Sequence, residues 1–433
     1  MRGKMMKLKK ILLPLVILIL TATVLTGCST YKIFEQTYLS SDYQEKIVIG
    51  VFEAQTGEYS KEGQDEIAGI ELANSIYGEV IGKEIEIVVI DNQSNIYTSK
   101  SAIEGLIKLD PIGIIGSAGE VCSLAASDTI KQVQIPAITP SCSNPLITLD
   151  NDYYFRVSAL ESTVGKGLAE YAIEKMKAST VGIIKIKDDD AHRSIIRNFV
   201  YQMDTYDNEK HSLSMNISID SDESDFETLM GSIKRFEPSV LFMPVGLNKA
   251  DAIFTEIENQ GLTDITFLGT KDWSKQEFYD MMKKHPDIKV AFASDTIVTE
   301  PKKTNDNASL EADKFLLEYK LKYGQNEVPS ENVALGYDAY LLIINAINDA
   351  GSTDHEAVRE ALADTYNLKG VTGTFRFSED GNPQRPINIA TLSDGNPVLD
   401  YVANDTAVIT EEKIVVETID IKEDDEEDIE GEE

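Results

Sequence analysis

Short apolar runs alternate with amphipathic stretches along most of this chain. The first run, from Ile47 to Val51, has the continuous apolar pattern of a strand that is buried on both faces of a parallel sheet. The stretch from Gln64 to Tyr77 then places apolar residues at helical spacing. The alternation continues, with predicted strands at 85–90, 112–115, 137–139, 180–186, 239–243, 265–269 and 289–292 and predicted helices at 99–109, 192–203, 249–260, 307–323 and 334–350.

Repeated strand–helix units predict an α/β fold with parallel sheets that helices cover on both faces, and their number predicts two such domains. Ligands of open sheets bind beyond the carboxyl ends of the strands. We therefore expect functional residues in the loops that follow these strands, after Ile115, Thr139, Ile186, Met243 and Leu268.

The beginning of the chain has the pattern of an export signal over residues 1–27. Five basic residues among the first ten precede a largely apolar run from Ile11 to Val24, and Leu-Thr-Gly-Cys ends at Cys28. The run is shorter than the roughly 20 residues that a spanning helix needs. Its ending resembles the lipoprotein signals of bacteria, which implies cleavage before Cys28 and lipidation of this residue. An ordinary secretory signal with a chance cysteine is the alternative. We expect an extracytoplasmic protein, lipid-anchored to the cell membrane.

Charge limits the partners. The net charge of −34 argues against nucleic acid and anionic lipid headgroups, because both bind basic surfaces. Residues 28–45 are predicted to form a polar tether. Residues 411–433 carry a dense run of acids and are predicted to form a disordered tail, with a cation-binding or protein-docking segment as the alternative.

Motifs for catalysis are missing from the sequence. The four histidines are scattered, and no Cys-x-x-Cys, Gly-x-Ser-x-Gly or phosphate loop occurs. The glycines at 113–119 are not spaced as in a dinucleotide site, and Asp188 to Asp190 is interpreted as a charged turn. Cys122 and Cys142 could pair, although two buried thiols are the favoured interpretation. We predict no enzyme, no cofactor and no metal.

Several loops together resemble one known family. They include Gln-Thr-Gly-Glu-Tyr at 55–59, Thr-Pro-Ser-Cys-Ser-Asn-Pro at 139–145, Gly-Tyr-Asp-Ala at 336–339 and Gly-Val-Thr-Gly at 370–373. In this order they resemble the branched-chain amino-acid-binding (leucine-binding) receptors, the type I periplasmic binding proteins of ABC importers, from about Lys46 to Val402. The resemblance implies two Rossmann-like lobes joined by a three-crossover hinge that close on a ligand, with lobe 1 at 46–160 plus 294–375 and lobe 2 at 161–293 plus 376–410.

The resemblance also implies a ligand site between the lobes. Its candidate residues are Tyr59, Ser117, Ala118, Gly119, Glu120, Ser141, Cys142, Ser143, His192, Gly246, Lys271 and Asp272. Ser143 keeps the hydroxyl with which the family touches both carboxylate and ammonium, and Ser141 would offer its carbonyl. Four positions depart from the family pattern. Glu120 stands where the family has a Ser that binds the ligand carboxylate, and Lys271 stands where it has an acid that binds the ligand ammonium. Glu62 replaces an aromatic residue, and His192 replaces a Tyr.

Glu120 and Lys271 reverse the charges that suit a simple α-amino acid. Two carboxylates about 4 Å apart repel by roughly 4 kcal/mol at an effective dielectric near 20, which is nearly three decades of affinity. Three explanations are open. In the first, the loop register differs by one residue, so that Asp272 replaces the family acid and Glu120 points to solvent. In the second, the ligand carries a cation where the family carboxylate sits. In the third, Glu120 and Lys271 pair with each other and no small solute binds.

The predicted function is that of an extracytoplasmic solute-binding lipoprotein, a monomer that passes a small polar, amino-acid-like ligand to an ABC permease. The alternative is a ligand-sensing or envelope-enzyme-regulating lipoprotein without transport. Lipoproteins that activate cell-wall synthases look similar around Gly-Thr-x-x-Trp, found here at 269–273. Trp273 could line the site or pack in a lobe core, and Tyr337-Asp338 is expected to shape the hinge.

Overall fold

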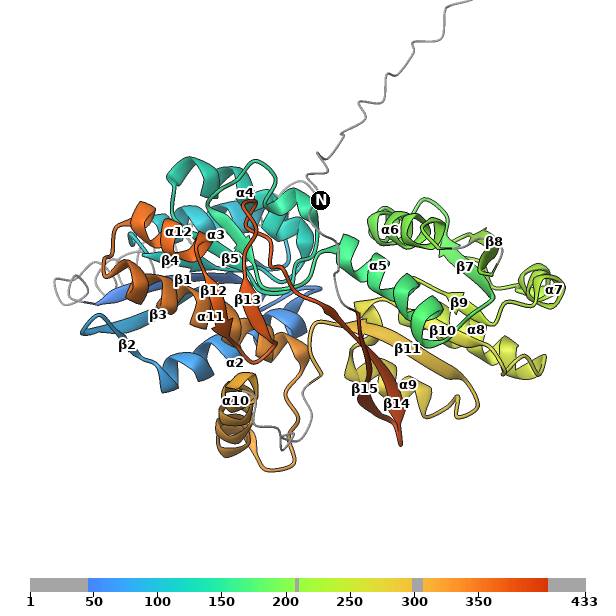
Figure 1. The fold of residues 1–433 in the computed structure, drawn as a ribbon. Helices are drawn as coiled ribbons and strands as arrows, with labels where there is room; N and C mark the ends of the chain where they lie inside the picture. Colours follow the sequence, from blue (N-terminus) through green and yellow to red (C-terminus); the bar gives the residue numbers. More distant parts are fainter. Residues whose placement is uncertain (1–45, 207–209, 298–306, 404–433) are drawn as a thin grey trace, which may run out of the picture.

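A computed structural model describes residues 46–206, 210–297 and 307–403, which form two lobes beside each other (Figure 1). The predicted signal at 1–27, Cys28, the tether at 28–45 and the acidic tail at 411–433 lie outside the described residues. Among the helices that are described, none combines the length and the apolar character needed to cross a bilayer. The lobe boundaries given above stay a prediction.

The first lobe is built on a six-stranded sheet with the order β2-β3-β1-β4-β5-β6. Its strands are parallel except for the edge strand β2, which runs antiparallel to β3. Every residue of β1 is buried, as its continuous apolar pattern predicts. The strands are β1 (Ile47–Glu53), β2 (Glu79–Val80), β3 (Lys83–Asp91), β4 (Gly113–Ile115), β5 (Ala137–Thr139) and β6 (Tyr154–Arg156).

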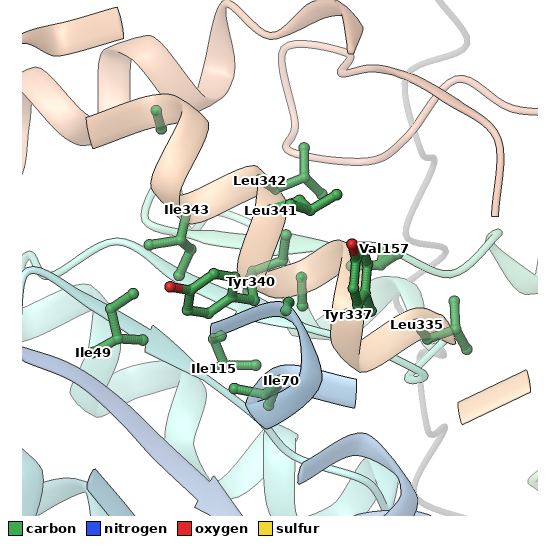
Figure 2. Packing of buried hydrophobic residues seen from close by; sticks show 14 of the residues in the cluster. Ile49, Ile70, Ile115, Val157, Leu335, Tyr337, Tyr340, Leu341, Leu342 and Ile343 are labelled. Atoms are coloured by element: carbon green, nitrogen blue, oxygen red, sulfur yellow. The ribbon is translucent and has the colours of Figure 1, made fainter. Parts of the chain in front are cut away.

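The core of the first lobe contains a helix from the far end of the chain, α11 (Glu331–Ala350), which packs on α2 (Ser60–Ile76). Figure 2 shows Tyr340 of α11 among the aliphatic side chains of this lobe. The two helices can approach closely because Gly336 has no side chain. A Cβ at this position would lie 2.2 Å from the carbonyl oxygen of Glu66. The other helices of this lobe are α3 (Ile96–Ile107), α4 (Glu120–Val133), α10 (Asn307–Tyr323) and α12 (His355–Ala363), and a short β12–β13 ribbon (Tyr366–Lys369 and Thr374–Arg376) lies beside them.

The second lobe has a seven-stranded sheet in the order β15-β14-β11-β10-β9-β7-β8. The five strands from β11 to β8 are parallel, whereas β14 runs antiparallel to β11 and pairs with β15 as a hairpin. The sequence predicted parallel strands only; the hairpin arises because the chain returns from the first lobe and β14 pairs antiparallel along the open edge of β11. The strands are β7 (Thr180–Ile186), β8 (Ser212–Ile219), β9 (Val240–Phe242), β10 (Thr266–Gly269), β11 (Lys289–Ser294), β14 (Ile387–Ser393) and β15 (Asn396–Ala403).

Helices cover the second sheet and enclose an aromatic core. Trp273 is fully buried, stacks on Phe278 at a centroid distance of 4.7 Å and donates its indole N–H to the carbonyl of Val245 at 3.2 Å. Of the two interpretations of Trp273, packing in the lobe core is therefore confirmed. The helices are α5 (Glu161–Glu170), a π-helical turn (Tyr171–Lys175), α6 (Arg193–Asp204), α7 (Glu227–Phe236), α8 (Leu247–Asn259), a 3-10 turn (Lys271–Trp273) and α9 (Gln276–Met282).

Three crossovers join the lobes: β6 to α5, β11 to α10 and β13 to β14 (Figure 1). Asp295, which follows β11, connects them, because its Oδ1 accepts from Ala159 N at 2.6 Å and its carbonyl accepts from Arg385 at 2.6 Å. The Asp338 carboxylate accepts hydrogen bonds from the backbone N–H and from the hydroxyl of Thr372, each at 2.7 Å. The carbonyl of Thr372 in turn accepts a hydrogen bond from Arg385. Asp338 therefore shapes the hinge, as expected.

Candidate functional site

Tyr59 and Gly119 meet where two loops of the first lobe approach each other. Gly119 precedes α4 with a φ of +85°, and a Cβ there would lie 2.4 Å from the ring of Tyr59. Both the positive φ and this contact require glycine at position 119. The structure thus brings together two of the predicted site residues.

Ser117 and Ala118 are buried and use their polar groups within the lobe. The Ser117 hydroxyl donates to its neighbour's carbonyl at 2.8 Å, and Ala118 N donates to Glu53 Oε2 at 2.7 Å. These bonds hold the loop in place, so that contact of either residue with a ligand stays a prediction.

Glu120 lies beside the Ser141–Ser143 segment. Its Oε1 accepts from the Ser143 hydroxyl at 3.3 Å and its Oε2 from Asn144 Nδ2 at 3.5 Å. Glu120 is also the first residue of α4, where the helix dipole favours a negative charge. Cys142 between the two serines is a buried, unpaired thiol that donates to the carbonyl of Ser117 at 3.0 Å.

Glu161 connects this segment with the second lobe. Its backbone N–H donates to the carbonyl of Ser143 at 3.2 Å, and its side chain lies beside Ser194 of α6. Burial, and then the nearby charge of Glu120, raises the pKa of Glu161 to about 7, whereas Lys271 acts in the opposite direction. We refer to the loops that carry Glu120, Ser143, Glu161, His192 and Lys271 as the inter-lobe junction.

His192 begins α6 and lies between two carboxylates of its own lobe. Its Nδ1 is 2.6 Å from Asp189 Oδ2 and its Nε2 is 2.8 Å from Asp272 Oδ2. Burial opposes the charged form, but the hydrogen bonds and charges of Asp272 and Asp189 raise the pKa of His192 to about 9. His192 is therefore a cation at neutral pH. The two aspartates beside it carry more negative charge than its single positive charge can balance.

Lys271 pairs with the hinge. Its Nζ lies 2.6 Å from Asp295 Oδ2, and the Asp295 side chain is only 1% exposed. Asp295 N in turn donates to the carboxylate of Glu331 at the start of α11. Lys271 is thus bound to Asp295 and not to Glu120, and Asp272 is bound to His192.

Two ion pairs cross from the first turn of α2 to α9. Glu62 Oε1 lies 2.9 Å from Lys275 Nζ, and Lys61 pairs with Glu277. Glu62, which stands where the family has an aromatic residue, therefore forms a polar contact between the lobes.

Gly246 is separate from the other candidates. It is exposed at the start of α8, and no described hydrogen bond connects it with them. In the described ranges, no group of three or more His, Cys, Asp or Glu side chains is arranged to hold a metal ion.

Sequence reasoning missed three buried glutamates near these loops: Glu161, Glu53 and Glu66. Burial raises the pKa of Glu53 to about 7 and that of Glu66 well above its usual value, and the nearby charge of Glu53 adds to the rise at Glu66. One signal was present, since Glu53 ends the buried strand β1. The burial of Glu66 and Glu161 depends on contacts between distant segments.

This chain is similar to a known protein family over most of its length. The model of the periplasmic binding protein family matches residues 46–396. A leucine-, isoleucine-, valine-, threonine- and alanine-binding protein of Pseudomonas aeruginosa is 24% identical over 335 residues, which cover 76% of this chain and 83% of the relative. A Leu/Ile/Val-binding protein of Escherichia coli is 29% identical over 150 residues, or 33% of this chain and 40% of that protein.

Solved structures share the two-lobed fold. A leucine-binding protein of Thermotoga maritima superposes with a TM-score of 0.69 at 24% identity, covering 83% of this chain and 99% of that one. A branched-chain amino-acid transporter substrate-binding protein of Streptococcus pneumoniae gives 0.66 at 25% identity, covering 82% and 100%. With the family match over most of its length, this chain belongs to the periplasmic binding protein family, with the fold of the type I, leucine-binding receptors.

Proposed function

We propose that this protein is an extracytoplasmic receptor that binds a small polar, amino-acid-like ligand between its lobes and delivers it to an ABC importer. Family membership supports this proposal, since its relatives are named as amino-acid-binding proteins. The Streptococcus pneumoniae structure is a complex with isoleucine, and a structure from Rhodopseudomonas palustris is a complex with benzoate. The fold therefore accepts more than one class of small solute.

The observation that carries the proposal is the arrangement at the inter-lobe junction. The first lobe contributes Ser143 and the start of α4, and the second contributes His192 at the start of α6. Helix N-termini offer free N–H groups, and polar side chains at the carboxyl ends of parallel strands orient a ligand. We assign these groups to ligand binding, without a catalytic step.

Isothermal titration of the full chain tests this function. Amino acids, amides, short peptides and polyamines form the panel, and we expect at least one to bind with one-to-one stoichiometry. Ser143→Ala should weaken that binding, whereas Ser232→Ala, at a half-buried position on α7, should not. Absence of binding across the panel would contradict the receptor function.

The lipid anchor is a separate part of the proposal. Lipidation of Cys28 would hold the receptor at the membrane surface beside its permease, as a monomer. In cells, Cys28→Ser should move the protein from the membrane fraction to the soluble extracytoplasmic fraction. A variant that stays in the membrane fraction would contradict anchoring through this residue.

A further inference from the structure

Two carboxylates at the inter-lobe junction lack a cationic partner. Glu120 accepts only from the neutral donors of Ser143 and Asn144, at 3.3 and 3.5 Å. Glu161 is 4% exposed and is held beside Ser143 by its backbone N–H. Within the described part of the chain, no Lys, Arg or His forms an ion pair with either carboxylate.

The cations nearest to this place already have partners. Lys271 binds Asp295 at 2.6 Å, and His192 is held between two aspartates. Arg156 is buried, donates to the carbonyl of Cys142 at 3.1 Å, and has an Nε without a hydrogen-bond partner among the described residues. The charges of Arg156 and Lys271 lower the pKa of Glu161, but neither cation forms an ion pair with Glu120 or Glu161.

An independent observation concerns Glu66, which belongs to a different element, α2. Glu66 is fully buried beside Ser141, and neither of its carboxyl oxygens has a hydrogen-bond partner in the described structure. Burial and the charge of Glu120 raise the pKa of the Cys142 thiol, and Glu66 adds to this effect, which places both carboxylates near the Ser141–Ser143 segment. Glu53, whose Oε1 also lacks a partner in the described structure, lies beside Glu66 as well. Because buried polar atoms nearly always have a partner, these two carboxyl groups together point to a hydrogen-bond donor near this segment.

We propose that the ligand carries a hydrogen-bonding cation, an ammonium or a guanidinium, and that Glu120 and Glu161 bind this cation beside Ser143. The inference rests on the proposed receptor function and names its class of ligand. Such a cation supplies several N–H donors to carboxylate and hydroxyl oxygens and stabilises the ionised form of both carboxylates. A ligand carboxylate in the same place would instead face Glu120 and Glu161.

Three leucine derivatives that differ in charge test this assignment: leucinamide is a cation, leucine a zwitterion and N-acetylleucine an anion. Agmatine adds a ligand with both an ammonium and a guanidinium and no carboxylate. In isothermal titration of the full chain, we expect leucinamide or agmatine to bind at least tenfold more tightly than leucine, and N-acetylleucine not to bind. Tighter binding of leucine than of both cations would overturn the inference and leave the receptor function standing.

Variants locate the binding group. Glu120→Gln and Glu161→Gln should each weaken binding of the cation at least tenfold and leave leucine unchanged or tighter, whereas Glu104→Gln, exposed on α3, should change neither. Thermal unfolding confirms that the variants fold, and Glu161→Gln should keep or raise the melting temperature because it removes repulsion from Glu120. Unchanged cation binding in both variants would overturn the assignment. No binding of any ligand in the panel would overturn the receptor function itself.

Discussion

Lys271 and Asp295 form an ion pair of 2.6 Å between the second lobe and the hinge. Asp295 also accepts from Ala159 N and, through its carbonyl, from Arg385, so that one carboxylate residue contacts all three crossovers. Lys271 is consequently a structural cation. Lys271 stands where the family has an acid, but its positive charge is used by Asp295. The lysine therefore does not by itself create a binding site for a negatively charged group of the ligand.

Removal of this cation should be costly. Lys271→Met leaves the Asp295 carboxylate buried without its partner, and the free energy of unfolding should fall by about 3–5 kcal/mol. Lys289→Met removes an exposed pair with Asp264 and should cost less than about 1 kcal/mol. Urea denaturation measures both variants. Equal, small effects would show that the Asp295 charge does not depend on Lys271.

Stability should depend on pH through His192. Asp272 and Asp189 overcome the effect of burial and raise its pKa from 6.5 to about 9. Because the folded-state pKa exceeds the unfolded value, this stabilisation is fully present below about pH 6.5 and is lost as the pH rises through about 9. The loss should amount to about 3–4 kcal/mol.

Denaturation of the wild type and of His192→Gln at pH 6 and pH 9.5 checks this expectation. The variant should lose the part of the pH dependence that the wild type owes to His192. The same slope in both proteins would contradict a protonated His192 in the folded state.

The ion pairs between α2 and α9 should favour the closed arrangement of the lobes. Both pairs are partly exposed, so each contributes about 0.2–1 kcal/mol and is weakened by salt. Lys61→Ala combined with Lys275→Ala should raise the ratio of open to closed molecules roughly two- to thirtyfold. Small-angle scattering should then show a larger radius of gyration, as it should for the wild type at high salt. An unchanged radius in both cases would argue against this role.

Gly119 should be intolerant of substitution. Gly119→Ala combines a positive φ with a clash against Tyr59 and should cost about 1–3 kcal/mol. Gly82→Ala is a matched control, since Gly82 has a similar φ of +75° with no atom within 4 Å of the added Cβ. Calorimetry should give a clearly larger loss at Gly119. Equal losses would mean that the contact with Tyr59 is not tight in solution.

Much of the fold follows from local patterns. The apolar run from Ile47 to Val51 and the segment from Thr180 to Ile186 form buried strands, and the amphipathic stretch from Ala334 to Ala350 lies within α11. These predictions hold because apolar periodicity reports directly on which faces must be buried. Composition and periodicity alone do not assign α11 to the first lobe. This assignment depends on the packing of α11 against α2, which lies more than two hundred residues earlier in the sequence.

The site was less predictable for the same reason. The loops after the strands were located correctly, and the pairs of Tyr59 with Gly119 and of Glu120 with Ser143 lie there. The partner of Lys271 comes from the hinge, however, and the burial of Glu161 depends on the contact between lobes. Such contacts cannot be predicted from the spacing of residues along the chain.

The central claim is that one small ligand contacts both lobes at once. Hydrogen-exchange mass spectrometry of the full chain with saturating leucinamide, or with leucine if it binds more tightly, tests this claim most directly. We predict slower exchange both around Ser141–Ser143 in the first lobe and around His192 and Asp272 in the second. Protection confined to one lobe, or absent from both, would contradict binding between them.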